Sequence, residues 1–162
     1  MLKLIFATNN QHKVEEIQAA IGNKMEVISL EQAGIHIEIP EPYDTLEANA
    51  SEKSLTINRL TGENCFSEDT GLEVTVLYGE PGVKSARYAG EEKSFENNIK
   101  KLLKNLEKQA DRRARFRTVI SLIWESKEYM FEGSCEGTIG VEPIGTMGFG
   151  YDPVFYPLGC DR

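Results

Sequence analysis

The chain has little of what disulfide-bonded, metal-cluster or membrane proteins need. Its three cysteines, Cys65, Cys135 and Cys160, are odd in number and widely spaced, and they form no CxxC pair. This pattern argues against a disulfide framework or a zinc site and favours a reducing compartment, so we expect all three to be inert packing residues. No apolar run approaches the roughly 20 residues that cross a bilayer, and the N-terminus lacks a secretory pattern. We therefore expect a cytoplasmic protein that does not bind membranes.

An excess of positive charge is also missing. The chain has 18 lysines and arginines against 26 aspartates and glutamates, which gives a formal net charge of −8. An acidic chain is poorly suited to a long polyanion, so we expect no nucleic-acid partner. A small nucleotide remains compatible, because one metal ion and two or three lysines can neutralise its phosphates.

Several catalytic signatures are absent as well. The chain has two histidines and no G-x-S-x-G elbow, which argues against a nucleophilic triad. It lacks the Walker A loop and the dinucleotide fingerprint G-x-G-x-x-G. His12 is expected to be a bystander, and His36, in the alternating stretch 35–37, an ordinary strand residue. Metal-assisted attack by water is the chemistry that remains.

Strands and helices are expected to alternate along the chain. Apolar residues recur with a 3.6-residue period in some segments and form short runs in others. This alternation, followed by a hairpin, indicates an α/β fold with a mixed sheet. Residues 73–78 fit either a strand or a helical turn. The expected strands are 3–7, 26–30, 65–67, 116–124 and 129–139, and the expected helices run up to Gly22, from a capping box of Asp44 and Glu47 to Gly62, and over 94–111.

A polar segment joins the first strand to the first helix. Thr8, Asn9 and Asn10 lie at the junction, and Lys13 lies one turn into the helix. Backbone N–H groups and the helix dipole at such a junction attract anions, and these side chains could complete a phosphate cradle. The alternative is a simple capped helix start.

Carboxylates precede and follow the second helix. Glu41 comes before it, and Glu68 and Asp69 are adjacent after the apolar segment 65–67. Adjacent strand residues point to opposite faces, so both reach one site only where the strand ends, and Thr70-Gly71 is expected to supply that turn. Carboxylates gathered in this way suit Mg²⁺, with water and phosphate oxygens as its further ligands. For Glu41 alone, an ordinary surface acid is the competing interpretation.

A glycine-rich aromatic segment lies near the C-terminal end. The glycines around Phe149 and Tyr151 would let the backbone approach a flat ligand, with Phe149 stacking on a base. Asp152 could then accept hydrogen bonds from ring N–H groups. An aromatic turn that fills the core is the alternative.

Together, these segments resemble the inosine triphosphate pyrophosphatase family. The matching stretches are ATNNQHKVEEI, TLEANASEK, SEDTGLEV, PGVKSARYAG and GTMGFGYDPVF, in the family's order over residues 6–155. The resemblance implies Mg²⁺-dependent hydrolysis of non-standard purine nucleoside triphosphates (ITP, dITP, XTP) to the monophosphate and pyrophosphate, which cleanses the nucleotide pool. It also implies a homodimer and an elongated mixed β-sheet flanked by helices, with two lobes around a central cleft.

The resemblance also assigns roles to individual residues. Asp69 would be the general base, and Ser85–Tyr88 match a family motif that could shape the cleft or form the dimer contact. The family continues past GFGYDP through a helix with a Ser-His-Arg motif, whereas this chain ends at Arg162. We therefore expect one nucleotide pyrophosphatase domain over residues 1–162 that is C-terminally incomplete. The implied metal ligands are Glu41, Glu68 and Asp69, and the implied substrate-binding residues are Thr8, Asn9, Asn10, Lys13, Lys53, Thr70, Phe149, Gly150, Tyr151 and Asp152.

Two other functions stay open. One is a pyrophosphatase for modified pyrimidine nucleotides, which a substrate panel would reveal. The other is a nucleotide-binding remnant that binds nucleotide but does not turn it over.

Overall fold

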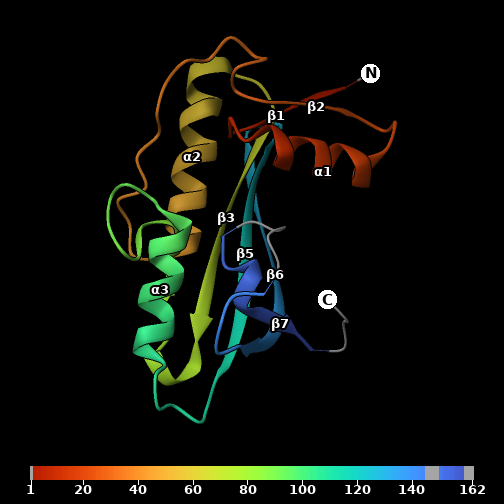
Figure 1. Ribbon diagram of the computed structural model, residues 1–162. Coiled ribbons are helices and arrows are strands. Elements are labelled where there is room, and N and C mark those ends of the chain that lie inside the picture. Colours follow the sequence, from red (N-terminus) through yellow and green to blue (C-terminus); the bar gives the residue numbers. More distant parts are fainter. Residues whose placement is uncertain (1, 145–149, 159–162) are drawn as a thin grey trace. The chain divides into compact units, whose positions relative to one another are not determined.

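The chain folds into two compact units, each built from two separate stretches (Figure 1). The structure is a computed structural model that describes residues 2–144 and 150–158. The first unit comprises residues 1–69 and 119–132, and the second comprises residues 70–118 and 133–162. In the described part of the chain, no helix is both long and apolar enough to cross a membrane.

The strands form one mixed sheet in the order β2-β1-β3-β5-β6-β7, with β4 paired to β3. β1 is parallel to both β2 and β3, whereas β4 is antiparallel to β3 and β7 is antiparallel to β6. The expected α/β fold with a mixed sheet flanked by helices is thereby confirmed. The bounds are β1 Lys3–Phe6, β2 Glu26–Ile28, β3 Cys65–Val74, β4 Pro81–Gly82, β5 Arg113–Trp124, β6 Lys127–Ile139 and β7 Phe155–Pro157.

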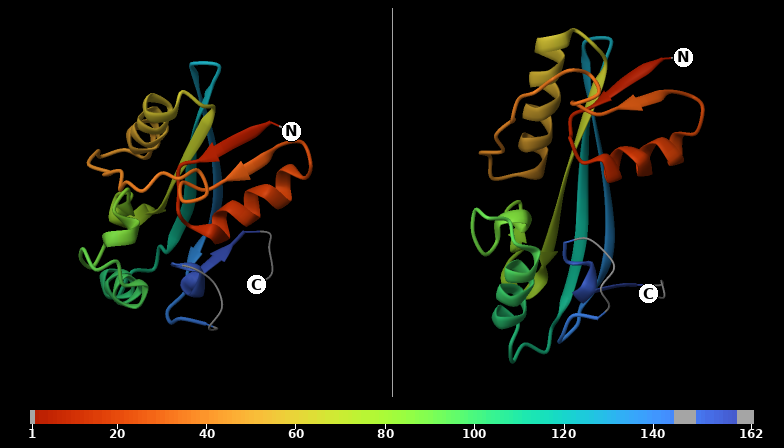
Figure 2. Two further views of the ribbon diagram at one scale, coloured as in Figure 1. Left: turned by 90° about the horizontal axis from the view of Figure 1, so that it is seen from above. Right: turned by 45° about the horizontal axis from the view of Figure 1, so that its top comes forward.

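In the first unit, two helices cover opposite faces of the sheet (Figure 2). Side chains alternate along β1, so Phe6 packs with Val14 of α1 (Gln11–Ile21). Ile5 packs instead with Ile57 of α2 (Leu46–Thr61). Each helix therefore buries its apolar stripe against one row of β1 and β3 residues.

The second unit is organised around α3 (Phe95–Asn105), which begins at the capping residue Ser94. Leu102 and Leu106 are fully buried in a cluster with residues of β3, β5 and β7. Short 3₁₀ helices at Thr75–Leu77, Ser85–Arg87 and Asp152–Val154 connect the longer elements. Residues 73–78 thus combine both expected structures, because β3 ends at Val74 and a helical turn follows.

Four details of the sequence interpretation are wrong. The side chain that caps α2 is Thr45, whose hydroxyl accepts the Ala48 N–H at 3.1 Å, so Asp44 is not the cap. No strand forms around His36, because residues 35–42 pair with no other strand. Cys65 is buried as expected but Cys135 is exposed, and Cys160 lies outside the described residues. The third helix ends at Asn105, earlier than expected.

Candidate active site

The start of α1 is a capped helix terminus with polar side chains around it. The side chain of Asn10 caps the helix by accepting the Lys13 N–H at 3.2 Å, and Thr8 Oγ1 accepts the Asn10 N–H at 3.1 Å. The capped-start interpretation is therefore correct. The predicted phosphate cradle at this helix start remains compatible with the cap. The positive end of an 11-residue helix lies here, and the Thr8 hydroxyl still has a proton that it can donate to an anion.

Asn9 has a different local task from its neighbours. Its side-chain oxygen accepts the Glu31 N–H at 3.0 Å, which ties the start of α1 to the turn after β2. A role of Asn9 in substrate binding would have to use the amide nitrogen of this exposed side chain.

Two lysines reach β3 from the two helices of the first unit. Lys13 of α1 forms an ion pair with the carboxylate of Glu68. Lys53 of α2 donates to the Glu68 carbonyl oxygen at 2.7 Å, and its Nζ lies 3.6 Å from Glu41 Oε1. The side chain of Lys53 is only 13% exposed. The structure thus brings together four of the residues that the sequence analysis singled out.

Asp69 completes this cluster with an unsatisfied carboxylate. Its Oδ2 is buried and has no hydrogen-bond partner among the described residues. Burial raises the pKa of Asp69 to about 7, opposed chiefly by the positive charge of Lys53 and reinforced by Glu41 and Glu68. Native proteins rarely leave a buried polar atom without a partner, so this oxygen marks a candidate functional position.

The predicted turn at Thr70-Gly71 is wrong. β3 runs without interruption from Cys65 to Val74, because β4 pairs with it at Leu72 and Glu73. Glu68 and Asp69 therefore lie within a strand, where successive side chains point to opposite faces. In the second unit, Thr70 Oγ1 lies 2.8 Å from Thr118 Oγ1, within hydrogen-bond distance.

The carboxylates fit Mg²⁺ only together with ligands from outside the protein. Among residues 2–144 and 150–158, no three His, Cys, Asp or Glu side chains are grouped so that they could hold a metal ion by themselves. Mg²⁺ commonly binds through one or two carboxylates, with water and substrate phosphates filling the remaining positions. The unpaired oxygen of Asp69, in the field of Glu41 and Glu68, is consistent with such an incomplete site.

In the second unit, the structure describes three of the four predicted base-binding residues. Gly150 adopts a positive φ of 61°, which favours glycine. Tyr151 is buried, and its hydroxyl donates to the Ser85 carbonyl oxygen at 2.6 Å. Asp152 begins the 3₁₀ helix that follows and is half-buried. The predicted stacking residue, Phe149, lies outside the described residues.

Asn98 is a residue that the sequence analysis missed. It is 2% exposed and bonds to the backbone of Ser85, Ala86 and Ala89. The available signal was its spacing, since it lies four residues before Leu102 on the apolar stripe of α3. A polar residue on a buried stripe indicates a specific hydrogen-bonding task.

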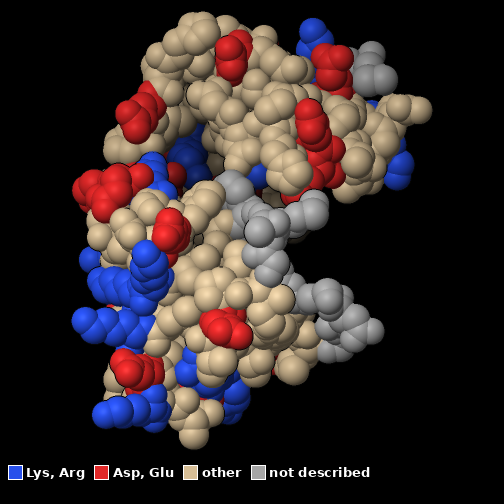
Figure 3. All heavy atoms as spheres, in the orientation of Figure 1, with Lys and Arg blue, Asp and Glu red and all other residues tan. Residues whose placement is uncertain are grey.

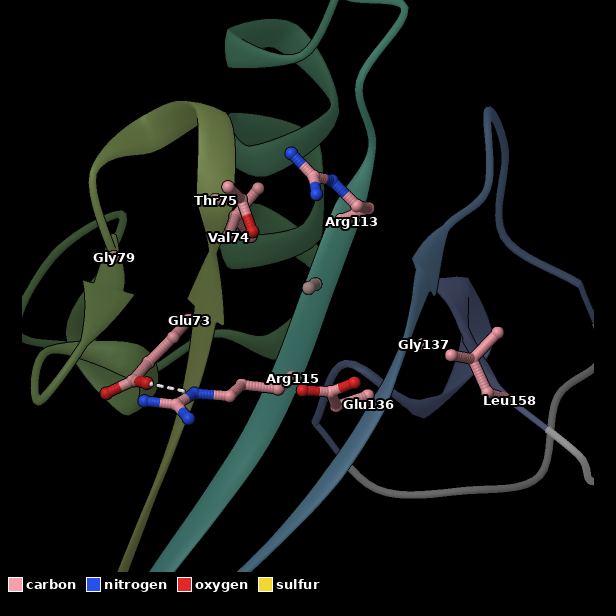
Figure 4. Close-up of a pocket in the computed structure, with 10 residues that line it drawn as sticks. Glu73, Val74, Thr75, Gly79, Arg113, Arg115, Glu136, Gly137 and Leu158 are labelled. Atoms are coloured by element: carbon pink, nitrogen blue, oxygen red, sulfur yellow. Dashed lines mark hydrogen bonds and ion pairs between the residues drawn. The ribbon is translucent and has the colours of Figure 1, made fainter.

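A cavity of about 430 Å³ in the second unit contains none of the predicted site residues (Figure 4). Three of its charged side chains, Glu73, Arg113 and Arg115, are already paired. Arg115 Nε donates to Glu73 Oε1 at 2.8 Å, and Arg113 forms an ion pair with Asp111. Basic side chains also gather over α3, where Lys100, Lys101 and Lys104 are exposed (Figure 3).

Known proteins resemble this chain along almost its whole length. The model of the Ham1 family matches residues 4–162. The dITP/XTP pyrophosphatase of Flavobacterium johnsoniae is 47% identical over 161 residues, which are 99% of this chain and 84% of that protein. The protein of the same name from Porphyromonas gingivalis is 49% identical over 160 residues, or 98% of this chain and 82% of that protein.

Solved structures agree with the sequence relatives. The Staphylococcus aureus Ham1 protein has a TM-score of 0.87 and 40% identity, covering 95% of this chain and 80% of that one. A HAM1 protein from Coxiella burnetii has a TM-score of 0.89 and 34% identity, covering 96% of this chain and 82% of that one. The family resemblance of the five sequence segments is thereby confirmed, and the chain belongs to the Ham1 family.

Proposed function

We propose that this protein is a pyrophosphohydrolase that converts non-standard purine nucleoside triphosphates, such as dITP, ITP and XTP, to the monophosphate and pyrophosphate. One observation carries the proposal: a buried carboxylate oxygen of Asp69 has no partner within residues 2–144 and 150–158, and it lies beside two lysines that contact β3. The names of the relatives from Flavobacterium johnsoniae and Porphyromonas gingivalis support it.

In this proposal, residues at the start of α1, in α2 and in β3 bind the phosphates. Lys13 and Lys53 neutralise the negative charge of the substrate and of the pyrophosphate that leaves, and Thr8 and Asn10 hold phosphate oxygens at the helix start. Water attacks phosphorus, the bridging P–O bond between the α and β phosphates breaks, and the electron pair leaves on pyrophosphate. Asp69 accepts the proton that water loses. Thr70 contributes a hydroxyl to a phosphate.

Asp69 and Glu41 would hold Mg²⁺, and Glu68, whose side chain points to the other face of β3, would contribute only its charge. When bound, the metal supplies positive charge for the phosphates and favours the ionised form of Asp69. Asp69 needs that help, because its own environment leaves it half-protonated near pH 7. Glu68 is already paired with Lys13, so Asp69 and Glu41 are the stronger ligand candidates.

Residues of the second unit select the base. Hypoxanthine and xanthine carry an N1–H donor, whereas adenine presents an acceptor at the same atom, so the Asp152 carboxylate favours the oxo-purines. Leaving a buried polar group unpaired commonly costs about 1–3 kcal/mol, which is enough for useful discrimination. Gly150 permits close backbone approach, and Phe149 would stack on the ring.

Three further properties belong to the same proposal. The protein is a homodimer, it acts in the cytoplasm on a small-molecule substrate without nucleic acid, and residues 1–162 act as one nucleotide pyrophosphatase domain. Light scattering coupled to gel filtration tests the first of these.

A turnover assay tests the proposed reaction. Purified protein with Mg²⁺ is given dITP, ITP, XTP, ATP and modified pyrimidine triphosphates, and phosphate is measured with and without added inorganic pyrophosphatase. We expect signal from the oxo-purines only when pyrophosphatase is present, and none after EDTA. Equal turnover of ATP, or direct orthophosphate release, would contradict the proposal. Preference for pyrimidines would favour the alternative enzyme, and binding without turnover the nucleotide-binding remnant.

The matched pair Asp69→Asn and Asp44→Asn localises the activity. Asp69→Asn keeps the shape of the side chain but cannot accept a proton, so kcat should fall by at least about 100-fold, as for loss of a general base. Asp44 is an exposed acid outside the cluster, and its variant should retain wild-type turnover.

A further inference from the structure

The segment Ser85–Tyr88, whose task the sequence left open, is the anchor of a buried hydrogen-bond network in the second unit. The carbonyl oxygen of Ser85 accepts two hydrogen bonds, from the Tyr151 hydroxyl at 2.6 Å and from Asn98 Nδ2 at 3.3 Å. Tyr151 is 5% exposed and Asn98 is 2% exposed. Hydrogen bonds shielded from water in this way hold their geometry firmly.

The Ser85 carbonyl is itself fixed by surrounding backbone. The Ser85 hydroxyl donates to the Gly82 carbonyl at 2.6 Å and accepts the Leu72 N–H at 2.9 Å, which binds it to β4 and β3. Asn98 of α3 accepts the Ala89 N–H at 2.7 Å. The acceptor of the Tyr151 hydroxyl is therefore held by a helix and by two strands.

Tyr151 is joined to the turn that carries Asp152. Its own carbonyl accepts the N–H groups of Val154 at 3.0 Å and Phe155 at 3.1 Å, which closes the 3₁₀ turn. Its hydroxyl joins this turn to the Ser85 segment by a hydrogen bond. Without the hydroxyl the turn would stay closed, but its attachment to the Ser85 carbonyl would be lost.

We propose that Tyr151, through the Ser85 carbonyl that Asn98 supports, is a positioning residue for base selection: it fixes the orientation of Asp152 toward an oxo-purine ring. This proposal rests on the proposed function, because it assigns a cause to the selectivity expected of Asp152. Binding groups have to be held to within about half an ångström to discriminate, and such precision depends on the residues behind them.

Tyr151→Phe is the decisive variant, because it removes one oxygen and leaves the buried ring in place. We expect the ratio of kcat/KM for ITP over ATP to fall by about fivefold or more, the equivalent of one net hydrogen bond. The loss should lie in KM for ITP, with kcat at saturation within about twofold of wild type, because the phosphate-binding residues are unchanged. Tyr156→Phe, a half-buried tyrosine of β7, is the control and should leave the ratio unchanged.

Ser85→Ala tests the same network from the other side. It keeps the accepting carbonyl but removes the hydroxyl that fixes it, so the ITP/ATP ratio should fall in the same direction. The double variant Tyr151→Phe with Ser85→Ala should lose less selectivity than the two single variants combined, when each loss in the ITP/ATP ratio is expressed as a free energy. Both substitutions act through the same carbonyl group. Melting temperatures are measured for every variant.

The outcomes separate this proposal from the one it rests on. A wild-type protein with no preference for ITP over ATP would overturn the proposed function. A selective wild type whose ratio survives both Tyr151→Phe and Ser85→Ala would overturn the positioning role alone, as would a lowered melting temperature with an unchanged ratio. That last result would mean that the hydroxyl serves only to satisfy the core.

Discussion

At the residue scale, the most informative side chain is Asp69. Burial destabilises its ionised form and raises its pKa to about 7, and one of its oxygens meets no partner in the described part of the chain. In an unfolded chain the same group has a pKa near 3.8. Between these two values the folded protein binds the extra proton, so the stability of the protein falls as pH rises through this window.

Asp69→Asn should therefore stabilise the metal-free protein at high pH. The gain in unfolding free energy should be small near pH 4 and reach a few kcal/mol, on the order of 1.4 kcal/mol per pKa unit, by pH 8. Urea unfolding in EDTA at pH 5, 6, 7 and 8 measures it, with Asp44→Asn as the control. A gain that does not change between pH 5 and pH 8 would show that Asp69 does not titrate there.

The two lysines should differ in their effect on activity. Lys53 is the largest influence that lowers the pKa of Asp69, and Lys13 is a smaller one. Lys53→Met should therefore raise the pKa of Asp69 and move the acidic limb of the pH–rate profile to higher pH, by more than Lys13→Met does. Profiles of kcat/KM between pH 5 and 9 measure the position of the acidic limb for each variant. A larger shift for Lys13→Met would contradict the arrangement of charges.

Much of this site was predictable from the types of its residues, but its geometry was not. Lys13 and Glu68 lie 55 residues apart, and only the pairing of β1 with β3 brings their elements together. Asn98 escaped prediction because its role depends on which backbone groups it meets, and periodicity alone does not show that.

At the element scale, local patterns predicted the strands and helices better than their ends. Hydrophobic periodicity predicted β1 and α1. The polar turn between β5 and β6 predicted that these two strands form a hairpin. Glu125 and Ser126 form that turn with φ of 49° and 66°, the left-handed geometry of tight hairpins. The N-cap of α2 was mistaken because Asp44 and Thr45 are both capping residue types, and only the backbone direction decides between them.

Capping of α2 can be tested by paired substitutions. Thr45→Ala removes the hydroxyl that accepts the Ala48 N–H, which should cost about 1 kcal/mol of unfolding free energy. Asp44→Ala should cost clearly less, because Asp44 does not provide the capping bond. Chemical denaturation of both variants measures the difference, and a larger loss for Asp44→Ala would restore the original interpretation.

Gly71 explains why β3 continues where a turn was predicted. It faces Gly82 of β4 so closely that an added Cβ would lie 2.5 Å from the Gly82 carbonyl oxygen. Gly71→Ala should therefore destabilise the protein by about 1–3 kcal/mol, as overpacking does. Gly133→Ala in β6 has open space around the new atom and serves as the control. Equal melting temperatures for the two variants would exclude this close approach.

At the scale of the whole molecule, the two units share three strands. β3, β5 and β6 each begin in one unit and end in the other, and each unit consists of two separate stretches. Strand ladders that continue through both units should make them unfold together, so calorimetry should show one transition with equal calorimetric and van't Hoff enthalpies. Two resolved transitions would show that the shared strands do not couple the units.

The division into stretches also bears on the order in which the protein assembles on the ribosome. The phosphate-binding candidates, residues 8–69, are made first, yet the apolar cluster behind them includes Ile123. The Ser54 hydroxyl lies 2.6 Å from that of Ser121, which emerges 67 residues later. The first unit thus lacks part of its core until the β5–β6 hairpin has been synthesised, which comes after residues 70–112 of the second unit. A nascent chain can therefore complete the proposed phosphate-binding site only late in translation.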